Sequence, residues 1–208
     1  MNIVHIFPEI NKGGTERIVL SLARQQAKKN QVSIIVFSNK DLYPNLTDGL
    51  TIIKITEPTY IEYSAFGVKK KSLSELTEQL AQLNPDIIHS HSFWTDLLLL
   101  SIPKLKAKYI GHFHLYNDLF DVKFGFTKKQ ITQFLDKRRM IRKYRAYDFN
   151  FVSISKDIDQ KFKDTFPYDL TNRFHLIPNA IDLPDLNQRK NRKLSSNREF
   201  VLLNVSRL

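Results

Sequence analysis

The sequence predicts an α/β fold with a doubly wound, mostly parallel sheet of the Rossmann-like kind. Apolar runs rich in Ile and Val recur along the 208 residues, and most are followed by a segment with helical periodicity. These runs are continuous rather than alternating, which is typical of strands buried on both faces. Regular alternation of such strands with helices indicates parallel strands joined by crossover helices. Hydrophobic residues make up 42% of the chain, which suffices for a sizeable core.

The predicted elements follow one another from the N-terminus. Strands are expected near residues 3–7, 32–38, 51–55, 86–90, 107–113, 150–155 and 174–177. Helices are expected over about 15–29, 72–83, 93–101, 128–147 and 156–165. The second helix ends at Asn84-Pro85, because a residue before proline avoids the helical region. In the fourth helix, apolar residues recur at helical spacing and most basic residues take the other face.

The composition changes after residue 184. Residues 185–199 are polar and basic and lack periodicity, which is typical of a linker. Residues 200–208 return to an apolar strand pattern, and a buried parallel strand needs neighbours and a crossover helix. We therefore expect one domain over residues 1–184, a linker over 185–199, and the first strand of a truncated second domain over 200–208. A terminal strand that returns to the first sheet is the alternative.

Other features of the composition exclude whole classes of site. The chain has no cysteine, which excludes disulfides, thiolate metal sites and a cysteine nucleophile. The N-terminus lacks the pattern of a signal peptide, and no apolar run approaches the roughly 20 residues of a membrane span. A cytoplasmic protein is the expectation.

The net charge of +11 is unevenly distributed. Residues 121–148 hold nine Lys/Arg and three acidic residues, and so carry +6. Such a segment attracts nucleic acid, an anionic membrane surface or phosphorylated substrates. An ordinary solvated helix face is the alternative. We name as the basic set the five residues that would form this patch, Lys137, Arg138, Arg139, Arg142 and Lys143.

A glycine turn separates the first predicted strand from the first helix. Gly13 and Gly14 would lie at the carboxyl edge of the sheet, where ligands of open α/β sheets bind. Glycine lets a phosphate or sugar approach the backbone, and the helix directs free N–H groups and its positive end there. A simple turn with Thr15 as helix N-cap is the alternative. The turn matches neither the dinucleotide fingerprint nor the P-loop.

Two histidine pairs end neighbouring predicted strands. His89 and His91 form one pair, and His112 and His114 form the other, with His5 expected below them. Residues i and i+2 of a strand share a face, so four imidazoles are expected to gather beside the glycine turn. Three hypotheses follow: a metal site, a site that binds or polarises a polar substrate, and packed histidines bonded to the backbone. No carboxylate ligand recurs at a matching spacing, and the substrate hypothesis is favoured.

Further polar and aromatic residues follow the same strand ends. Trp94 and Tyr116 would be able to stack on sugar or base rings, and Asn179 follows the last predicted strand of the first domain. No His-Glu-x-x-His metal motif and no catalytic carboxylate pair of defined spacing occurs.

Taken together, these motifs resemble family 4 of the glycosyltransferases, the retaining enzymes with the GT-B fold. The segments that carry the resemblance are GGTER at 13–17, DIIHSHS at 86–92, IGHFH at 110–114, YDFNFVSISKDI at 147–158, IPNAID at 177–182 and LLNVSRL at 202–208. Ala180 and Ser206 each stand where the family usually has glycine, and His112 stands where it often has threonine.

The resemblance implies that the chain is the N-terminal, acceptor-side half of a two-domain GT-B enzyme. It implies a nucleotide-sugar co-substrate, such as a UDP- or GDP-sugar, and neither a metal nor another cofactor. Gly13 and Gly14 match the turn that approaches the donor diphosphate and sugar. His114 matches the catalytic-site histidine that contacts the transferred sugar, whereas His91, His112 and Asn179 match positions in the acceptor cleft.

The resemblance also implies sugar transfer with retention, by front-face attack. The family's Glu-x7-Glu carboxylates belong to the second domain, so the isolated chain is expected to have little or no activity. Lipid-linked or polymeric cell-envelope glycans are the expected acceptors, and the basic set suits peripheral association with the inner membrane face.

A polyanion-binding module for RNA or DNA is the rival hypothesis. Known nucleic-acid-binding patterns are missing and the aromatic residues are not interleaved with basic ones, so no nucleic-acid partner is expected.

Overall fold

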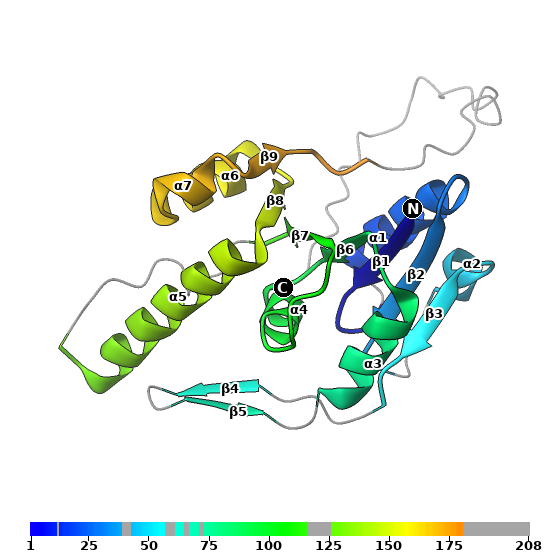
Figure 1. Cartoon of the computed structure of the whole chain (residues 1–208). Helices are drawn as coiled ribbons and strands as arrows, with labels where there is room; N and C mark the ends of the chain where they lie inside the picture. The colour runs from blue at the N-terminus through cyan, green and yellow to red at the C-terminus, as the bar shows by residue number, and fades with distance from the viewer. Residues whose placement is uncertain are drawn as a thin grey trace, which may run out of the picture.

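The computed structural model describes residues 1–11, 13–38, 43–56, 61–64, 67–70, 73–115 and 126–180; it gives only the backbone for 61–64, 67–70 and 128–129. Seven strands form one sheet (Figure 1). They are β1 Asn2–Ile6, β2 Gln31–Val36, β3 Thr51–Lys54, β6 Ile87–Ser90, β7 Lys108–Phe113, β8 Phe149–Ser153 and β9 Phe174–Leu176. Each corresponds to a strand that the sequence predicts.

The strand order is β3-β2-β1-β6-β7-β8-β9, and every pair in this sheet is parallel. The chain winds outward from β1 to β3, then returns to β6 and winds the other way. This reversal between β1 and β6 is the topological switch point, where open α/β sheets bind ligands. The predicted fold class, a doubly wound Rossmann-like sheet, is confirmed.

The predicted helices are α1 Gly14–Ala27, α3 Ser74–Leu83, α4 Phe93–Leu99, α5 Lys128–Tyr147 and α6 Lys156–Thr165. In α4 and α5, Ser92 and Thr127 each accept a hydrogen bond from the backbone N–H three residues later. The alternative that made Thr15 an N-cap is wrong, because α1 begins at Gly14 with Gly13 as its N-cap. Gly13 has the extended backbone conformation that is typical of an N-cap residue, and it makes no side-chain hydrogen bond.

Two hydrophobic clusters lie on opposite faces of the sheet. Successive residues of β1 serve different clusters, since Ile3 packs with Val19 and Leu20 of α1, whereas Val4 packs with Leu76 of α3. The cluster that contains Val4 continues through α4, α5 and α6. Burial on both faces explains why the strands read as continuous apolar runs.

Two short helices and a hairpin of two short strands have no counterpart in the prediction. They are the short helices α2 Pro44–Thr47 and α7 Tyr168–Thr171, and a hairpin of β4 Ile61–Ser64 and β5 Gly67–Lys70. Four-residue elements carry too little periodicity to be recognised from sequence. The hairpin runs near α5 and stays apart from the seven-stranded sheet (Figure 1).

Part of the predicted organisation lies outside the described residues. The linker over 185–199 and the strand over 200–208 belong to this part, so their prediction stands untested. Within the part of the chain that is described, no helix is both long enough and apolar enough to cross a membrane.

Candidate functional site

The strand register brings histidines from three strands to the switch point. His5 of β1 lies beside His89 of β6, and His89 lies beside Ile110 of β7, two residues before His112. His91 and His114 come directly after the ends of β6 and β7. The five residues that form the histidine cluster are His5, His89, His91, His112 and His114.

The rings of the histidine cluster contact one another. The ring centroids of His89 and His91 lie 4.1 Å apart, and those of His112 and His114 lie 4.2 Å apart. Between the two pairs, the His91 centroid lies 5.3 Å from that of His112 and 5.7 Å from that of His114. The predicted gathering of four imidazoles with His5 beside them is therefore present in the structure.

A chain of polar contacts runs through the histidine cluster to α1. His5 Nε2 lies 2.7 Å from Oε1 of Gln26, and His5 Nδ1 lies 2.8 Å from Nε2 of His91. His91 Nδ1 lies 3.4 Å from Nε2 of His114. The Gln26 carbonyl oxygen accepts a hydrogen bond, so His5 carries its proton on Nε2 and accepts from His91 on Nδ1. The remaining lone pair of His91 is then on Nδ1.

Burial keeps the histidine cluster uncharged. It lowers the pKa of His5 to about 4, that of His112 to about 3 and that of His114 to about 4. Burial also lowers the pKa of His89 and His91 well below 6.5, and the neighbouring histidines lower it further. At neutral pH these rings therefore offer lone pairs and N–H groups rather than positive charge.

Four ring nitrogens of the histidine cluster are buried without a hydrogen-bond partner among the described residues. They are Nε2 of His89, both ring nitrogens of His112, and Nδ1 of His114. A buried polar group without a partner costs about 1–3 kcal/mol, so a ligand that supplied these hydrogen bonds would recover that free energy.

A cleft of about 540 Å³ opens over this part of the sheet, and we call it the glycine–histidine cleft. Gly13 and Gly14 line it together with His91, His112 and His114. Further lining residues come from the chain after β1, the start of α1, the start of α4 and the end of β7, namely Phe7, Pro8, Thr15, Glu16, Ser92, Phe93, Trp94, Phe113 and Leu115. The structure thus brings together the glycine turn and the histidines that the sequence singles out.

The two glycines meet different demands in this cleft. A Cβ on Gly13 would overlap the carboxylate of Glu16, whereas a Cβ on Gly14 would meet no atom within 4 Å. Gly13 has an extended backbone, with φ −141° and ψ 163°, which any residue adopts. The only close approach to a Cβ there is therefore the flexible end of the Glu16 side chain, which is able to rotate away.

Asn179 lies outside the glycine–histidine cleft. It lines a smaller cavity of about 200 Å³ between α1 and the segment after β9, with Ile18, Leu22 and Pro178 among its neighbours. His112 borders both spaces. The prediction placed Asn179 in one cleft with His91 and His112, whereas the structure places it in an adjacent cavity that shares His112 with the cleft.

Of the two aromatic residues expected to stack on a sugar or base, Trp94 lines the glycine–histidine cleft. Tyr116 lies outside the described residues.

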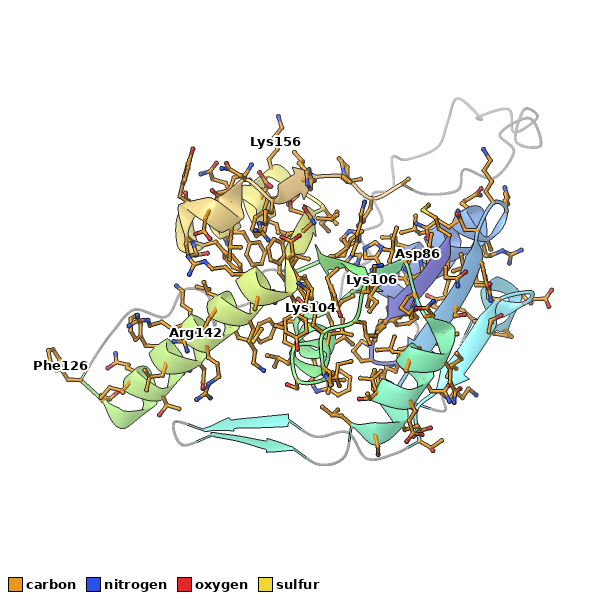
Figure 2. The ribbon with its side chains drawn as sticks, in the orientation of Figure 1. Asp86, Lys104, Lys106, Phe126, Arg142 and Lys156 are labelled. Carbon is orange, nitrogen blue, oxygen red and sulfur yellow. The ribbon has the colours of Figure 1, made fainter. Side chains whose placement is uncertain are left out.

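The structure divides the basic set rather than exposing it as one face. Arg138 and Arg142 are exposed, and Figure 2 labels Arg142 on α5. The guanidinium of Arg138 lies 5.9 Å from the centroid of the Phe134 ring. Lys143 is half-buried and donates to the carbonyl oxygen of Leu100 at the end of α4. Lys137 and Arg139 are also half-buried, and Arg139 lies 3.7 Å from Asp136.

For two residues of this region the sequence did not predict the hydrogen-bond partners. Gln26 reaches the histidine cluster from α1, and Asp96 of α4 is buried beneath the sheet edge, where Tyr144 Oη donates to its Oδ2 over 2.7 Å. Burial raises the pKa of Asp96 to about 7. Neither residue belongs to a sequence motif, and their partners lie 21 and 48 positions away.

Comparison with solved structures supports the fold. The Anabaena protein Alr3699/HepE in complex with UDP-glucose superimposes with a TM-score of 0.58 at 13% identity, over 88% of this chain and 44% of that one. The complex of the same protein with UDP and glucose superimposes with a TM-score of 0.55 at 14% identity, over 88% of this chain and 45% of that one. The chain thus spans somewhat under half the length of that protein. At this identity the likeness concerns the fold alone. A comparison with curated protein sequences found no match.

The family comparison is more specific. The model of Glycosyltransferase Family 4 matches residues 12–184, which include the glycine turn, both histidine pairs and Asn179. The match covers most of the chain, and the sheet topology agrees with it. The chain belongs to glycosyltransferase family 4.

Proposed function

We propose that the chain is the acceptor-side domain of an enzyme that transfers a sugar from a nucleotide-sugar, with retention, to a glycan or lipid-linked acceptor. One observation carries the proposal: the glycine turn and three uncharged imidazoles line a single cleft at the switch point of the sheet. The Anabaena protein of the same fold binds UDP and UDP-glucose, which supports a UDP-sugar as donor.

The first residues of α1 suit the donor diphosphate. The helix begins at Gly14, and its first N–H groups and positive dipole end favour negative charge. Gly14 leaves open space where a side chain would otherwise project. In this proposal Gly13 and Gly14 form the wall against which the diphosphate and the transferred sugar lie.

His114 would contact the transferred sugar as a neutral group. Its Nδ1 is buried without a partner among the described residues, so a sugar hydroxyl would supply the missing hydrogen bond. His91 and His112 line the same cleft and would position the acceptor, with Asn179 in the adjacent cavity. Such a site works by positioning and by fixed dipoles, and the leaving phosphate takes up the acceptor proton.

The donor-binding half is expected to follow this chain. We propose a domain over residues 1–184, a linker over 185–199, and the first strand of the donor domain over 200–208. The 208 residues alone would then show little or no sugar transfer, because half of the site is missing. Sugar transfer by this chain alone would contradict this part of the proposal.

The first half of α5 supports contact with a membrane. Phe126, just before α5, is 95% exposed (Figure 2). Ile131 and Leu135 are exposed on the N-terminal half of the helix, which also carries the exposed Arg138 one turn after Leu135. Apolar side chains next to basic ones are the combination that binds an anionic lipid surface. A cytoplasmic enzyme of polysaccharide biosynthesis, peripheral on the inner membrane face, would present this end of α5 to its lipid-linked acceptor.

The transferase proposal is tested with the longer protein that it expects. Release of UDP or GDP is measured for a panel of UDP- and GDP-sugars, with a membrane lipid extract as acceptor. His114→Ala is expected to lower kcat tenfold or more, the effect of about 1.5 kcal/mol. His175→Ala, an exposed histidine of β9, is the matched control and should leave kcat unchanged. No nucleotide release, or full activity of His114→Ala, would refute the role of the cleft.

The membrane proposal has its own test. Binding of the 208-residue chain to anionic vesicles is compared with binding to single-stranded oligonucleotides across a salt series. Phe126→Ser with Arg138→Glu is expected to weaken vesicle binding at least tenfold. Tighter binding to oligonucleotides than to vesicles would favour the polyanion-binding hypothesis instead.

A further inference from the structure

Three of the clustered histidines form one chain of hydrogen bonds that begins on α1. Gln26 Oε1 lies 2.7 Å from His5 Nε2, and His5 Nδ1 lies 2.8 Å from His91 Nε2. His91 Nδ1 lies 3.4 Å from His114 Nε2, which is a long hydrogen bond. Each imidazole between the ends uses one ring nitrogen toward each neighbour. Gln26 therefore forms one end of the chain, and Nδ1 of His114 forms the other.

Gln26 sets the direction of every hydrogen bond in this chain. Burial lowers the pKa of all three histidines, so each ring is neutral at neutral pH, with one N–H and one lone pair. The Gln26 carbonyl oxygen has no proton to give, so His5 donates from Nε2 and accepts at Nδ1. His91 then donates from Nε2 and accepts at Nδ1, and His114 donates from Nε2. The lone pair of His114 is therefore left on Nδ1.

The opposite order of protons is unfavourable. With its lone pair on Nε2, His5 would bring one acceptor within 2.7 Å of another, in a buried place where an unsatisfied polar group is most costly. Only a turn of the Gln26 amide, with its NH₂ group toward His5, would reverse the whole chain. His114 would then carry its proton on Nδ1. The two orders thus differ in the tautomer of His114, which is measurable.

The far end of the chain lies at the glycine–histidine cleft. His114 lines the cleft, and its Nδ1 is buried without a partner among the described residues. A lone pair on this nitrogen suits a hydroxyl group, which is able to donate, and not an ionised phosphate oxygen, which only accepts. The start of α1 at Gly14 has the opposite preference, because free N–H groups favour an anion. The cleft thus distinguishes the hydroxyl-bearing part of a ligand from its anionic part.

We propose that Gln26 and His5 are positioning residues that fix the tautomer of His114, so that Nδ1 of His114 accepts a hydrogen bond from a hydroxyl group of the cleft ligand. Gln26 and His5 are not among the residues that line the cleft, so they act through His91. The identity of the ligand rests on the proposed function, in which this hydroxyl group belongs to the transferred sugar. The tautomer does not depend on sugar transfer and is measured without a ligand.

The direct test is ¹⁵N NMR of the imidazole rings in the 208-residue chain at neutral pH, with the signals of His114 assigned by their loss in His114→Gln. We expect Nδ1 of His114 to give the signal of an unprotonated nitrogen and Nε2 that of an N–H. Gln26→Leu removes the acceptor and is expected to give a mixture of both tautomers. Gln26→Glu keeps an accepting oxygen and should keep the wild-type tautomer. Gln25→Leu, at the exposed neighbouring position of α1, is the matched control and should also keep it.

Two results of this experiment would overturn the proposal. One is a proton on Nδ1 of His114 in the wild type, and the other is an unchanged tautomer in Gln26→Leu. Should Gln26→Leu fail to fold, Gln26→Met, which has a similar volume and no acceptor of comparable strength, replaces it.

Nucleotide release by the longer protein of the proposed function gives a separate measurement. Gln26→Leu should lower kcat about fivefold, the effect of one hydrogen bond, whereas Gln25→Leu should not lower it. An altered tautomer with an unchanged kcat would refute the positioning role. No nucleotide release by the wild type would refute the proposed function instead, and the NMR spectra would still decide whether Gln26 fixes the tautomer.

Discussion

The buried carboxyl of Asp96 makes the stability of the fold depend on pH in a calculable way. The side chain is 1% exposed on α4, and burial raises its pKa from 3.8 to about 7, against the lowering effect of hydrogen bonds from Ser90 and Tyr144. In the unfolded chain the same carboxyl titrates near 3.8. The folded state therefore keeps a proton that the unfolded state loses as the pH rises between these two values.

The sign of the effect follows from this proton difference. Between pH 3.8 and about 7 the folded chain binds more protons at Asp96 than the unfolded chain does, so the free energy of unfolding falls as the pH rises. Above about pH 7 both states are ionised and the contribution stops changing. Asp96→Asn does not titrate and lacks this fall. As the pH rises through this window, the free energy of unfolding of the variant should therefore increase relative to that of the wild type. The increase is about 1.4 kcal/mol per pH unit, or about 4 kcal/mol over the whole window.

Urea unfolding of both chains at half-unit steps from pH 4.5 to 8.5 measures this difference. The histidine cluster is common to both chains, so its own pH dependence cancels in the comparison. Asp157→Asn, at an exposed position in the first turn of α6, is the matched control for the exchange of carboxyl for amide. A difference between Asp96→Asn and the wild type that stays constant within about 0.5 kcal/mol from pH 4.5 to 7 would refute a protonated Asp96.

Three further predictions concern the core and the cleft. Phe151→Ala should lower the free energy of unfolding by about 3–5 kcal/mol in urea titrations, because Phe151 is fully buried and its ring stacks 4.7 Å from that of Phe174; a loss under about 1 kcal/mol would contradict this packing. Tyr144→Phe should lower the free energy of unfolding by about 1–3 kcal/mol at pH 8, because the ionised Asp96 loses a hydrogen-bond donor, and by less at pH 5. Equal losses at the two pH values would argue against a change in the charge of Asp96 between them. Gly13→Ala should change stability by under about 1 kcal/mol, because the flexible Glu16 side chain yields, yet shift the amide NMR signals of residues 14–17; unchanged signals would contradict the close approach.

The local elements of the fold were predictable because their signals are local. Continuous apolar runs marked the seven strands of the sheet, and glycine at 13–14 and proline at 85 marked element boundaries that α1 and α3 confirm. Two periodicities, 2 for strands and 3.6 for helices, were enough to place the histidine pairs at strand ends. The gathering of the histidine cluster followed from parallel strands ending at one edge.

The sequence by itself thus determined the doubly wound sheet, the family and the residues that meet at its carboxyl edge. Only the tertiary structure decided their partners: Gln26 behind His5, Tyr144 on Asp96, and Asn179 in a cavity beside the glycine–histidine cleft. The tertiary structure also divided the basic set. Lys143 is half-buried and donates to the carbonyl oxygen of Leu100 at the end of α4, whereas the neighbouring Arg142 is exposed. Periodicity records which face of an element is buried, whereas pairing of side chains depends on distances between elements that no local pattern encodes.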